Sequence, residues 1–288
     1  FFMTPQAVAP PDAVNWPLEA LWLAVAPRVP GLSLECLPSI DSTNSELMRR
    51  ARGGQLDPVI LIAERQTAGR GRLGRSWLTG QAAVPPAHLP ALTFSYGLPL
   101  PRRDLAGLSL AVGVAVAEAL RALGCTLARL KWPNDVWLDD TGRKLAGILI
   151  ETALCDGQLY AIVGVGINLD APRLASTADT PANTAAGLRE RLPGATAPGV
   201  LAAVVPALVE AVSCFGEAGF APFQARFAAL DALAGRALRL SGGPASGGGV
   251  ARGVDHTGAL LVDDGSGALH AISSGEVSVR AVTTPAEA

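Results

Sequence analysis

The sequence contains very little lysine. Its 23 basic residues are 21 arginines and two lysines, Lys131 and Lys144, which lie in one short segment. Arginine cannot replace lysine where a compact, mobile point charge must approach reacting atoms closely. The pair therefore points to a charged centre in that segment. The formal net charge is only -2, which argues against non-specific nucleic-acid binding through bulk charge.

Cysteine and long apolar runs are also scarce. The four cysteines are widely spaced and form no CxxC, so the sequence indicates neither a zinc module nor a dense disulfide framework and favours buried thiols. No uninterrupted apolar run reaches roughly 18 residues, so no transmembrane helix is predicted. The first residues carry neither a basic segment nor the apolar core of a signal peptide, which predicts a cytoplasmic location.

The 288 residues suffice for about two domains. Residues 1–31 hold six prolines and leave room for one short helix, over 18–25, and not for a three-helix DNA-binding unit. Residues 32–232 mix strand-like and helix-like segments. Residues 233–288 contain five short strand-like runs between glycine-rich turns, which favours a small barrel. The predicted fold class is α+β, with a mixed sheet and helices packed on it, followed by an all-β domain.

Local signals place the elements. Ser42 or Thr43 is the expected N-cap of a helix that Gly53-Gly54 ends. Apolar patterns predict strands over 32–37, 59–63, 91–98, 127–132 and 158–168, a hairpin over 136–138 and 144–152, and helices over 105–123, 198–215 and 220–230.

The loop Gly69–Arg75 is the first candidate site. Its three glycines let backbone amides approach a ligand, and its three arginines offer paired donors to phosphate oxygens. A solvated turn or an RGG-like nucleic-acid segment would carry the same residues. Trp77 follows, and it either packs in the core or lies against an aromatic ligand.

Other candidates follow further along the chain. Lys131-Trp132-Pro133-Asn134-Asp135 ends a strand, where the lysine could lie between two anions or simply extend to solvent from an Asn-Asp turn. Gly147, and Gly164 with Gly166, fall inside apolar strands, which suggests a planar ligand lying on the sheet or only close packing. The helix start Asp41–Asn44 could cap a polar ligand group or only its own helix.

Taken in this order, the segments resemble the biotin protein ligases. The resemblance rests on Asp41–Asn44, Gln66–Trp77, Lys131–Asp135, Lys144–Leu149 and Gly164–Asn168, and it covers about residues 36–282. Two departures are visible. Thr79–Pro90 replaces a short Pro-x-Gly-x-Asn turn, and the winged-helix domain of repressor-type members is missing, so operon repression is not expected.

The resemblance implies a catalytic domain over 32–232, an SH3-like C-terminal domain over 233–288, and a two-step reaction. Biotin and ATP, with Mg²⁺, would give biotinoyl-5′-AMP and pyrophosphate, and a lysine of a biotin carboxyl carrier domain would then take the biotin. The residues implied for biotin are Ser42, Thr43, Asn44, Gln66, Arg70, Gly71, Arg72, Lys131 and Gly147. Those implied for ATP are Arg72, Arg75, Trp77, Asn134, Asp135, Lys144, Gly166 and Asn168.

Within these sets Lys131 and Arg72 are the expected catalytic residues, and Mg²⁺ is expected to arrive with the ATP phosphates. A lipoate–protein ligase, which shares the adenylation chemistry, is the first alternative. A non-catalytic nucleic-acid-binding protein is the second. Neither DNA nor a membrane is an expected partner, and the choice between monomer and homodimer stays open.

Overall fold

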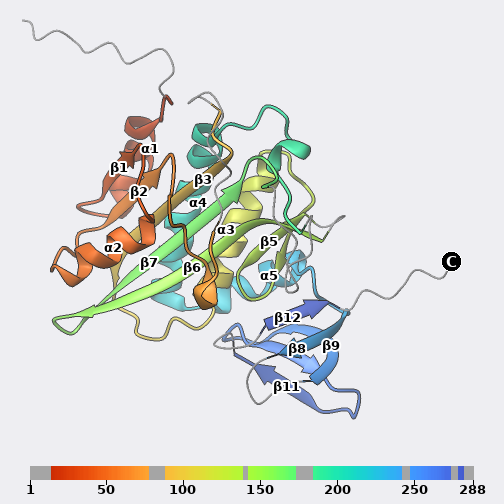
Figure 1. Cartoon of the computed structure of the whole chain (residues 1–288). Helices are drawn as coiled ribbons and strands as arrows, with labels where there is room; N and C mark the ends of the chain where they lie inside the picture. The colour runs from red at the N-terminus through yellow and green to blue at the C-terminus, as the bar shows by residue number, and fades with distance from the viewer. Residues whose placement is uncertain are drawn as a thin grey trace, which may run out of the picture.

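The computed structural model describes residues 14–77, 88–138, 142–172, 184–241, 247–273 and 278–281. A seven-stranded sheet forms the larger part of the molecule, and a five-stranded sheet follows it in the chain (Figure 1). Residues 1–13, most of the Thr79–Pro90 insertion and the hairpin turn at 139–141 lie outside the described residues.

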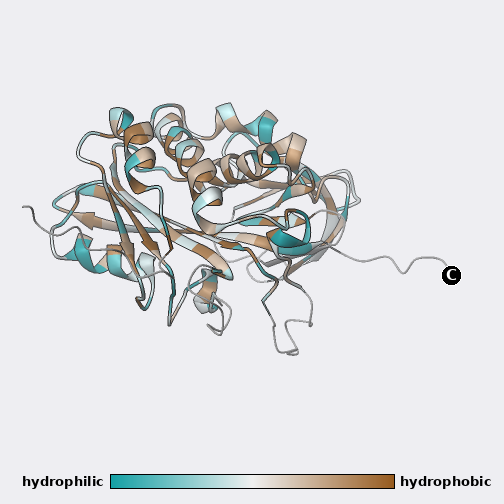
Figure 2. Ribbon diagram, turned by 90° about the horizontal axis from the view of Figure 1, so that it is seen from above, coloured by the Kyte–Doolittle hydropathy of each residue, from teal (hydrophilic) through white to brown (hydrophobic). Residues whose placement is uncertain are grey.

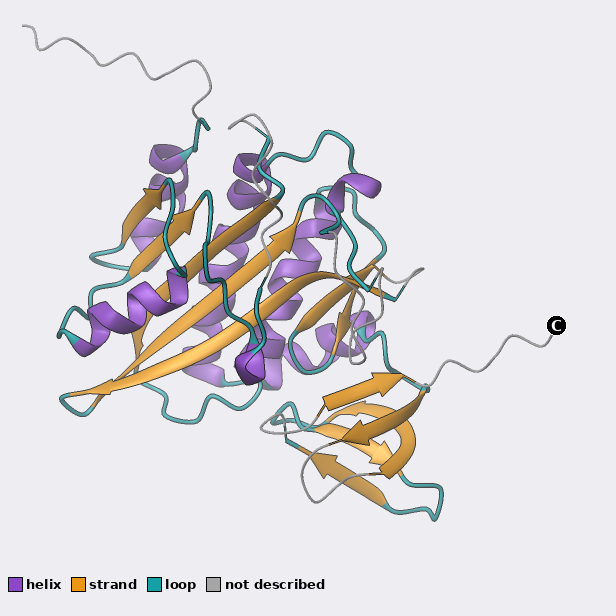
Figure 3. Ribbon diagram, viewed as in Figure 1, coloured by secondary structure: helices purple, strands orange, loops and turns teal. Residues whose placement is uncertain are grey.

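The large sheet has the strand order β1-β2-β3-β7-β6-β5-β4. Only β1 and β2 pair in parallel, and every other neighbouring pair is antiparallel. The bounds are β1 Ser33–Leu37, β2 Val59–Ala63, β3 Ala91–Leu100, β4 Ala128–Lys131, β5 Asp135–Leu138, β6 Arg143–Cys155 and β7 Gln158–Asn168. The three long strands β3, β7 and β6 lie side by side in the middle of the sheet, as Figure 3 shows.

The two faces of this sheet are covered unequally (Figure 2). One face carries α1 Leu18–Val25, α3 Leu108–Ala122, α4 Ala197–Ala218 and α5 Gln224–Leu230, whose apolar side chains form the main core. The other face carries α2 Thr43–Arg52, which packs Leu47 and Ala51 against Leu61 and Ile162. Much of the second face is therefore left to loops and polar side chains.

The ends of two helices show how local sequence sets the elements. Ser42 caps α2 as expected, because its hydroxyl accepts from the Ser45 amide at 3.4 Å. Helix α3 begins at Leu108 and not at Leu105, because Gly107 before it has φ 82° and cannot belong to a right-handed helix. Within the described ranges, four short 3-10 segments complete the helices, at Ala26–Arg28, Arg72–Gly74, Leu188–Glu190 and Ala221–Phe223.

Helix α4 bears on the prediction that the chain has no transmembrane helix. Among the described residues it is long and apolar enough, by length and composition alone, to cross a membrane. Counting uninterrupted apolar residues missed it, because Pro206 and Glu210 lie within the helix. Its position explains the composition, since α4 packs against α3 and places Leu201, Val205 and Leu208 in the core. A core helix meets the same length and composition criterion as a membrane span.

The five-stranded sheet is antiparallel, with the order β11-β10-β9-β8-β12. Its bounds are β8 Ala237–Ser241, β9 Gly247–Val254, β10 Leu260–Asp263, β11 Leu269–Ile272 and β12 Ser278–Ala281. It touches the first sheet through the Trp132 indole, which donates to the Gly258 carbonyl at 3.0 Å. The predicted α+β class is confirmed, while the domain boundaries at 31/32 and 232/233 remain proposals.

Candidate active site

The face of the large sheet beside α2 is hollow because small residues align across three strands. Thr93 of β3 pairs with Gly166 of β7, which pairs with Gly147 of β6. One step along, Ser95 pairs with Gly164. Side chains that are two residues apart on a strand share a face, so these positions leave an open strip on the sheet.

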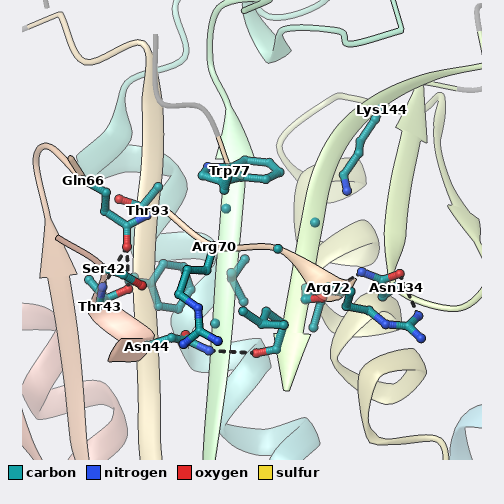
Figure 4. Close-up of a pocket in the computed structure, with 18 residues that line it drawn as sticks. Ser42, Thr43, Asn44, Gln66, Arg70, Arg72, Trp77, Thr93, Asn134 and Lys144 are labelled. Carbon is teal, nitrogen blue, oxygen red and sulfur yellow. Dashed lines mark hydrogen bonds between the residues drawn. The ribbon is translucent and has the colours of Figure 1, made fainter. Parts of the chain in front are cut away.

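Two adjoining pockets lie at this face, and the first of them lies over the strip. This Asn44 pocket is bounded by α2, the Gly-Arg loop (Gly69–Arg75) and the sheet (Figure 4). The Lys131 pocket lies beside it, between the same loop and the β4–β5 turn. They share the wall residues Gly71, Arg72, Trp77, Asn134 and Lys144.

The residues expected to hold biotin and ATP distribute over these pockets. The Asn44 pocket is lined by Ser42, Thr43, Asn44, Gln66, Arg70, Gly71, Arg72 and Gly147, which is the biotin set without Lys131. The Lys131 pocket is lined by Arg72, Arg75, Trp77, Asn134, Asp135 and Lys144 of the ATP set, together with Lys131. Gly166 lines only the Asn44 pocket. Asn168 is 4% exposed, and its amide donates to the Lys144 carbonyl at 3.3 Å.

A buried polar network closes one end of the Asn44 pocket. Gln66 Oε1 accepts from the Thr43 amide at 2.7 Å and lies 3.1 Å from the Thr43 hydroxyl. Ser95 Oγ lies 2.6 Å from both Thr43 Oγ1 and Asn44 Oδ1. The Asn44 amide nitrogen donates to the Leu149 carbonyl, which fixes the opposite oxygen of that amide toward Ser95.

The number of protons in this network indicates which ligand groups it can bind. The contacts Thr43–Gln66, Ser95–Thr43 and Ser95–Asn44 join four side-chain oxygens. Only the two hydroxyls among them carry a proton, because amide oxygens accept and do not donate. One of the three contacts therefore lacks a hydrogen. The network is rich in acceptors, and a ligand that donates an N–H or O–H suits this end of the pocket.

The Gly-Arg loop folds back on itself as a tight hairpin. The Trp77 amide donates to the Gly69 carbonyl at 2.9 Å, and the Gly71 amide donates to the Arg75 carbonyl at 2.7 Å. Leu73 at its tip has φ 56°, a left-handed conformation that is uncommon for a residue with a Cβ. Gly69 is needed at the base, because an added Cβ would lie 2.5 Å from the Trp77 carbonyl oxygen.

The glycines of the hollow strip are covered by protein side chains. A Cβ at Gly166 would lie 2.4 Å from the Trp77 ring, and one at Gly147 would lie 3.0 Å from it. A Cβ at Gly164 would lie 2.1 Å from Asn44 Oδ1. At Gly166 and Gly147 the structure shows the close-packing alternative, because the Trp77 indole covers both. Its Nε1 is buried without a hydrogen-bond partner among the described residues. A planar ligand on these glycines stays a prediction.

The Lys131 pocket gathers positive charge. Burial lowers the pKa of Lys131, and the nearby cations Lys144, Arg75 and Arg72 lower it further, while Asp135 opposes them. Burial also lowers the pKa of Arg72. Lys144 pairs with Asp135 at 2.6 Å and lies over the Trp77 ring at 5.5 Å. Four cations against one carboxylate form a site for a polyanion, because a bound anion relieves their mutual repulsion.

Sequence reasoning missed three polar residues at the site. Thr93 lines the Asn44 pocket, Ser95 lies behind it in the buried network, and Glu151 accepts from Asn44 and pairs with Arg70. All three lie in strands that read as apolar. Their alternation with buried neighbours was visible. The contacts of Ser95 and Glu151 with Asn44 depend on strand register, which a single sequence does not show.

Comparison with known protein families agrees with this geometry. The biotin/lipoate A/B protein ligase family model matches residues 36–168. The model for the biotin protein ligase C-terminal domain matches residues 237–280. The bifunctional ligase/repressor BirA of Escherichia coli is 35% identical over 254 residues, which cover 88% of this chain and 76% of that protein. The chain belongs to the biotin protein ligase family.

Two further relatives support the assignment. The biotin–[acetyl-CoA-carboxylase] ligase of Paracoccus denitrificans is 32% identical over 234 residues, covering 78% of this chain and 92% of that protein. The structure of the Aquifex aeolicus biotin protein ligase in complex with biotin and ATP matches with a TM-score of 0.69 and 30% identity, over 87% of this ligase and 99% of that chain. The expected family and enzyme class are thus confirmed, and the SH3-like terminal domain agrees with the matched C-terminal model.

Proposed function

We propose that this ligase joins biotin to ATP as biotinoyl-5′-AMP, with release of pyrophosphate, and then transfers the biotinoyl group to a lysine of a biotin carboxyl carrier domain. The acceptor-rich network of Thr43, Gln66, Ser95 and Asn44 carries the proposal. The ureido ring of biotin presents N–H donors, which suit an end of the pocket where side-chain oxygens outnumber the hydroxyl protons between them.

The same network argues against lipoate as the substrate. The dithiolane ring of lipoate has no N–H or O–H, so it offers no hydrogen-bond donor to this acceptor-rich end of the pocket. A site built for a hydrogen-bonding substrate rejects the analogue that lacks the hydrogen-bonding group. The matched biotin protein ligase C-terminal domain model supports the same choice.

In the first step a carboxylate oxygen of biotin attacks the α-phosphorus of ATP, and pyrophosphate leaves. With the ureido ring at Asn44, the biotin tail runs along the Asn44 pocket toward the shared wall, where Arg72 and Lys144 lie. Lys131 and Arg75 then face the phosphates from the Lys131 pocket. These cations offset the repulsion between two anions as charge builds at phosphorus.

Mg²⁺ would be held at this site mainly by the ATP phosphates. No group of three or more His, Cys, Asp or Glu side chains among the described residues could hold a cation. Asp135 and Asn134 line the Lys131 pocket and offer oxygen atoms, which are the donors that Mg²⁺ prefers. Mg²⁺ bound by the ATP phosphates would neutralise part of their charge, with Asp135 or Asn134 as its contact to the protein.

In the second step the ε-amine of the carrier lysine attacks the acyl carbon, and AMP leaves with its phosphate. The protein needs no nucleophile of its own for this transfer. The Gly-Arg loop would cover the mixed anhydride and keep water away until the carrier arrives.

The test is ATP–pyrophosphate exchange with and without biotin. Exchange should require biotin, disappear in excess EDTA and return with Mg²⁺, and a tenfold excess of lipoate should not inhibit it. Exchange that depends on lipoate would overturn the substrate assignment. Binding to a biotin-operon duplex that survives competitor DNA would revive the nucleic-acid alternative. We also propose that the protein is located in the cytoplasm.

A further inference from the structure

Glu151 lies outside both pockets and yet contacts two of the residues that line the Asn44 pocket. It is on β6, and its side chain is 18% exposed. One carboxylate oxygen lies 3.0 Å from Arg70 Nη2, and the other accepts from the Asn44 amide nitrogen at 3.0 Å. One side chain thus joins the Gly-Arg loop to the buried network at the start of α2.

The contact to Asn44 settles which way the amide points. An ionised carboxylate accepts hydrogen bonds and cannot donate, so the nitrogen of Asn44 must face Glu151 and the Leu149 carbonyl. The amide oxygen then faces Ser95 and the polar end of the pocket. The carboxylate is a second acceptor for the amide nitrogen beside the Leu149 carbonyl, so it strengthens the orientation that keeps the Asn44 donors away from the acceptor side of the network.

The contact to Arg70 holds the loop at its base. Arg70 also reaches the Ser45 hydroxyl at 3.4 Å, and its backbone bridges to Ser76 on the other arm of the hairpin. Arg70 is 48% exposed, so few other contacts restrain its side chain. The pair with Glu151 therefore ties the hairpin to the rigid centre of the sheet.

We propose that Glu151 is a positioning residue for biotin: it fixes the Asn44 amide and anchors the Gly-Arg loop through Arg70. The proposal rests on the function proposed above. It assigns Glu151 to the biotin side of the site alone, because Arg70 and Asn44 line the Asn44 pocket and not the Lys131 pocket.

The test is Glu151→Gln, which keeps the shape and removes the charge. In biotin-dependent ATP–pyrophosphate exchange the KM for biotin should rise about three- to fivefold, as expected for a partly exposed ion pair. The KM for ATP and kcat should stay within about twofold, since uniform substrate binding is what is lost. The adenylate, isolated on the enzyme, should escape about three- to fivefold faster.

Glu118→Gln is the matched control. Glu118 pairs with Arg226 through an ion pair in which both side chains are 40% or more exposed, away from the pockets. This variant should leave all three quantities unchanged. Arg70→Gln completes a double-mutant cycle. If Glu151 acts through Arg70, the KM for biotin of the double variant should not exceed that of the more impaired single variant.

The outcomes separate the two proposals. Absence of biotin-dependent exchange in the unaltered protein would refute the proposed function itself. An active unaltered protein with a Glu151→Gln variant that matches Glu118→Gln would refute the positioning role alone, and so would equal rises in the KM of biotin and ATP. Should Glu151→Gln fail to fold, an unchanged biotin KM and adenylate lifetime in Arg70→Gln would overturn the proposal.

Discussion

Gly164→Ala should be among the most damaging single-methyl additions near the site. The new Cβ would lie 2.1 Å from Asn44 Oδ1, whereas ordinary contact begins at 3.4 Å. The amide would have to move by more than 1 Å. Asn44 is 4% exposed and is held by Ser95, Leu149 and Glu151, so it cannot move without breaking hydrogen bonds.

Two contributions set the size of the effect. Forcing an extra methyl group into a packed interior costs about 1–3 kcal/mol, and leaving a buried hydrogen-bonding group unpaired costs about 1–3 kcal/mol more. We expect a loss of about 4 kcal/mol in the free energy of unfolding. In a chain of this size that lowers Tm by about 10 °C.

Thermal and urea unfolding measure the effect. Gly216→Ala is the control with the opposite sign: this glycine is inside α4, its added Cβ meets nothing nearer than 3.8 Å, and alanine in a helix should stabilise by about 0.5–1 kcal/mol. In an Asn44→Ala background the Gly164→Ala penalty should fall by at least about 2 kcal/mol, because the clashing atoms are gone. A penalty that is equal in both backgrounds would refute the reasoning.

Three further outcomes are expected. Lys131→Arg should keep the fold and lower biotin-dependent pyrophosphate exchange by about 100-fold or more, since one electrostatic donor at a reacting phosphate is worth about 3–4 kcal/mol; exchange near that of the unaltered enzyme would contradict the role. Arg72→Gly should still form the adenylate but release it, which biotinylation of bystander proteins would detect. Tyr96→Phe should be neutral or stabilising by up to about 1 kcal/mol in urea unfolding, because the Tyr96 hydroxyl is buried without a partner among the described residues.

Elements with strong local signals were predictable from the sequence. The predicted helix over 18–25 and strand over 59–63 match α1 and β2, and Ser42 and Gly53 fix the ends of α2. The expected strand over 144–152 falls short of β6, which runs to Cys155. Its last residues lie in the antiparallel pairing with β7, where Cys155 faces Gln158, and pairing is a tertiary property that overrides local pattern.

Site residues that belong to a sequence motif were predictable, whereas those placed at the site by strand register were not. The motif segments supply most of the lining of both pockets. Glu151 and Ser95 were missed because their importance lies in facing Arg70, Thr43 and Asn44 across the fold. The buried position of Asn168, behind the Lys144 backbone, likewise follows from strand packing, and its proposed role toward the nucleotide stays a prediction.

The contact between the two sheets has a consequence for protein engineering. The Trp132 indole that reaches the Gly258 carbonyl belongs to the same segment as Lys131 and Asn134. Beside it, a Cβ on Gly258 would lie 2.9 Å from the Gly107 Cα, and both glycines have φ above 80°. A terminal barrel grafted from another ligase must therefore bring a glycine and a free carbonyl at this turn. A chimera without them would misplace the segment that carries Lys131. Its defect would then be measured as weak ATP binding, although the altered residues lie in the grafted barrel.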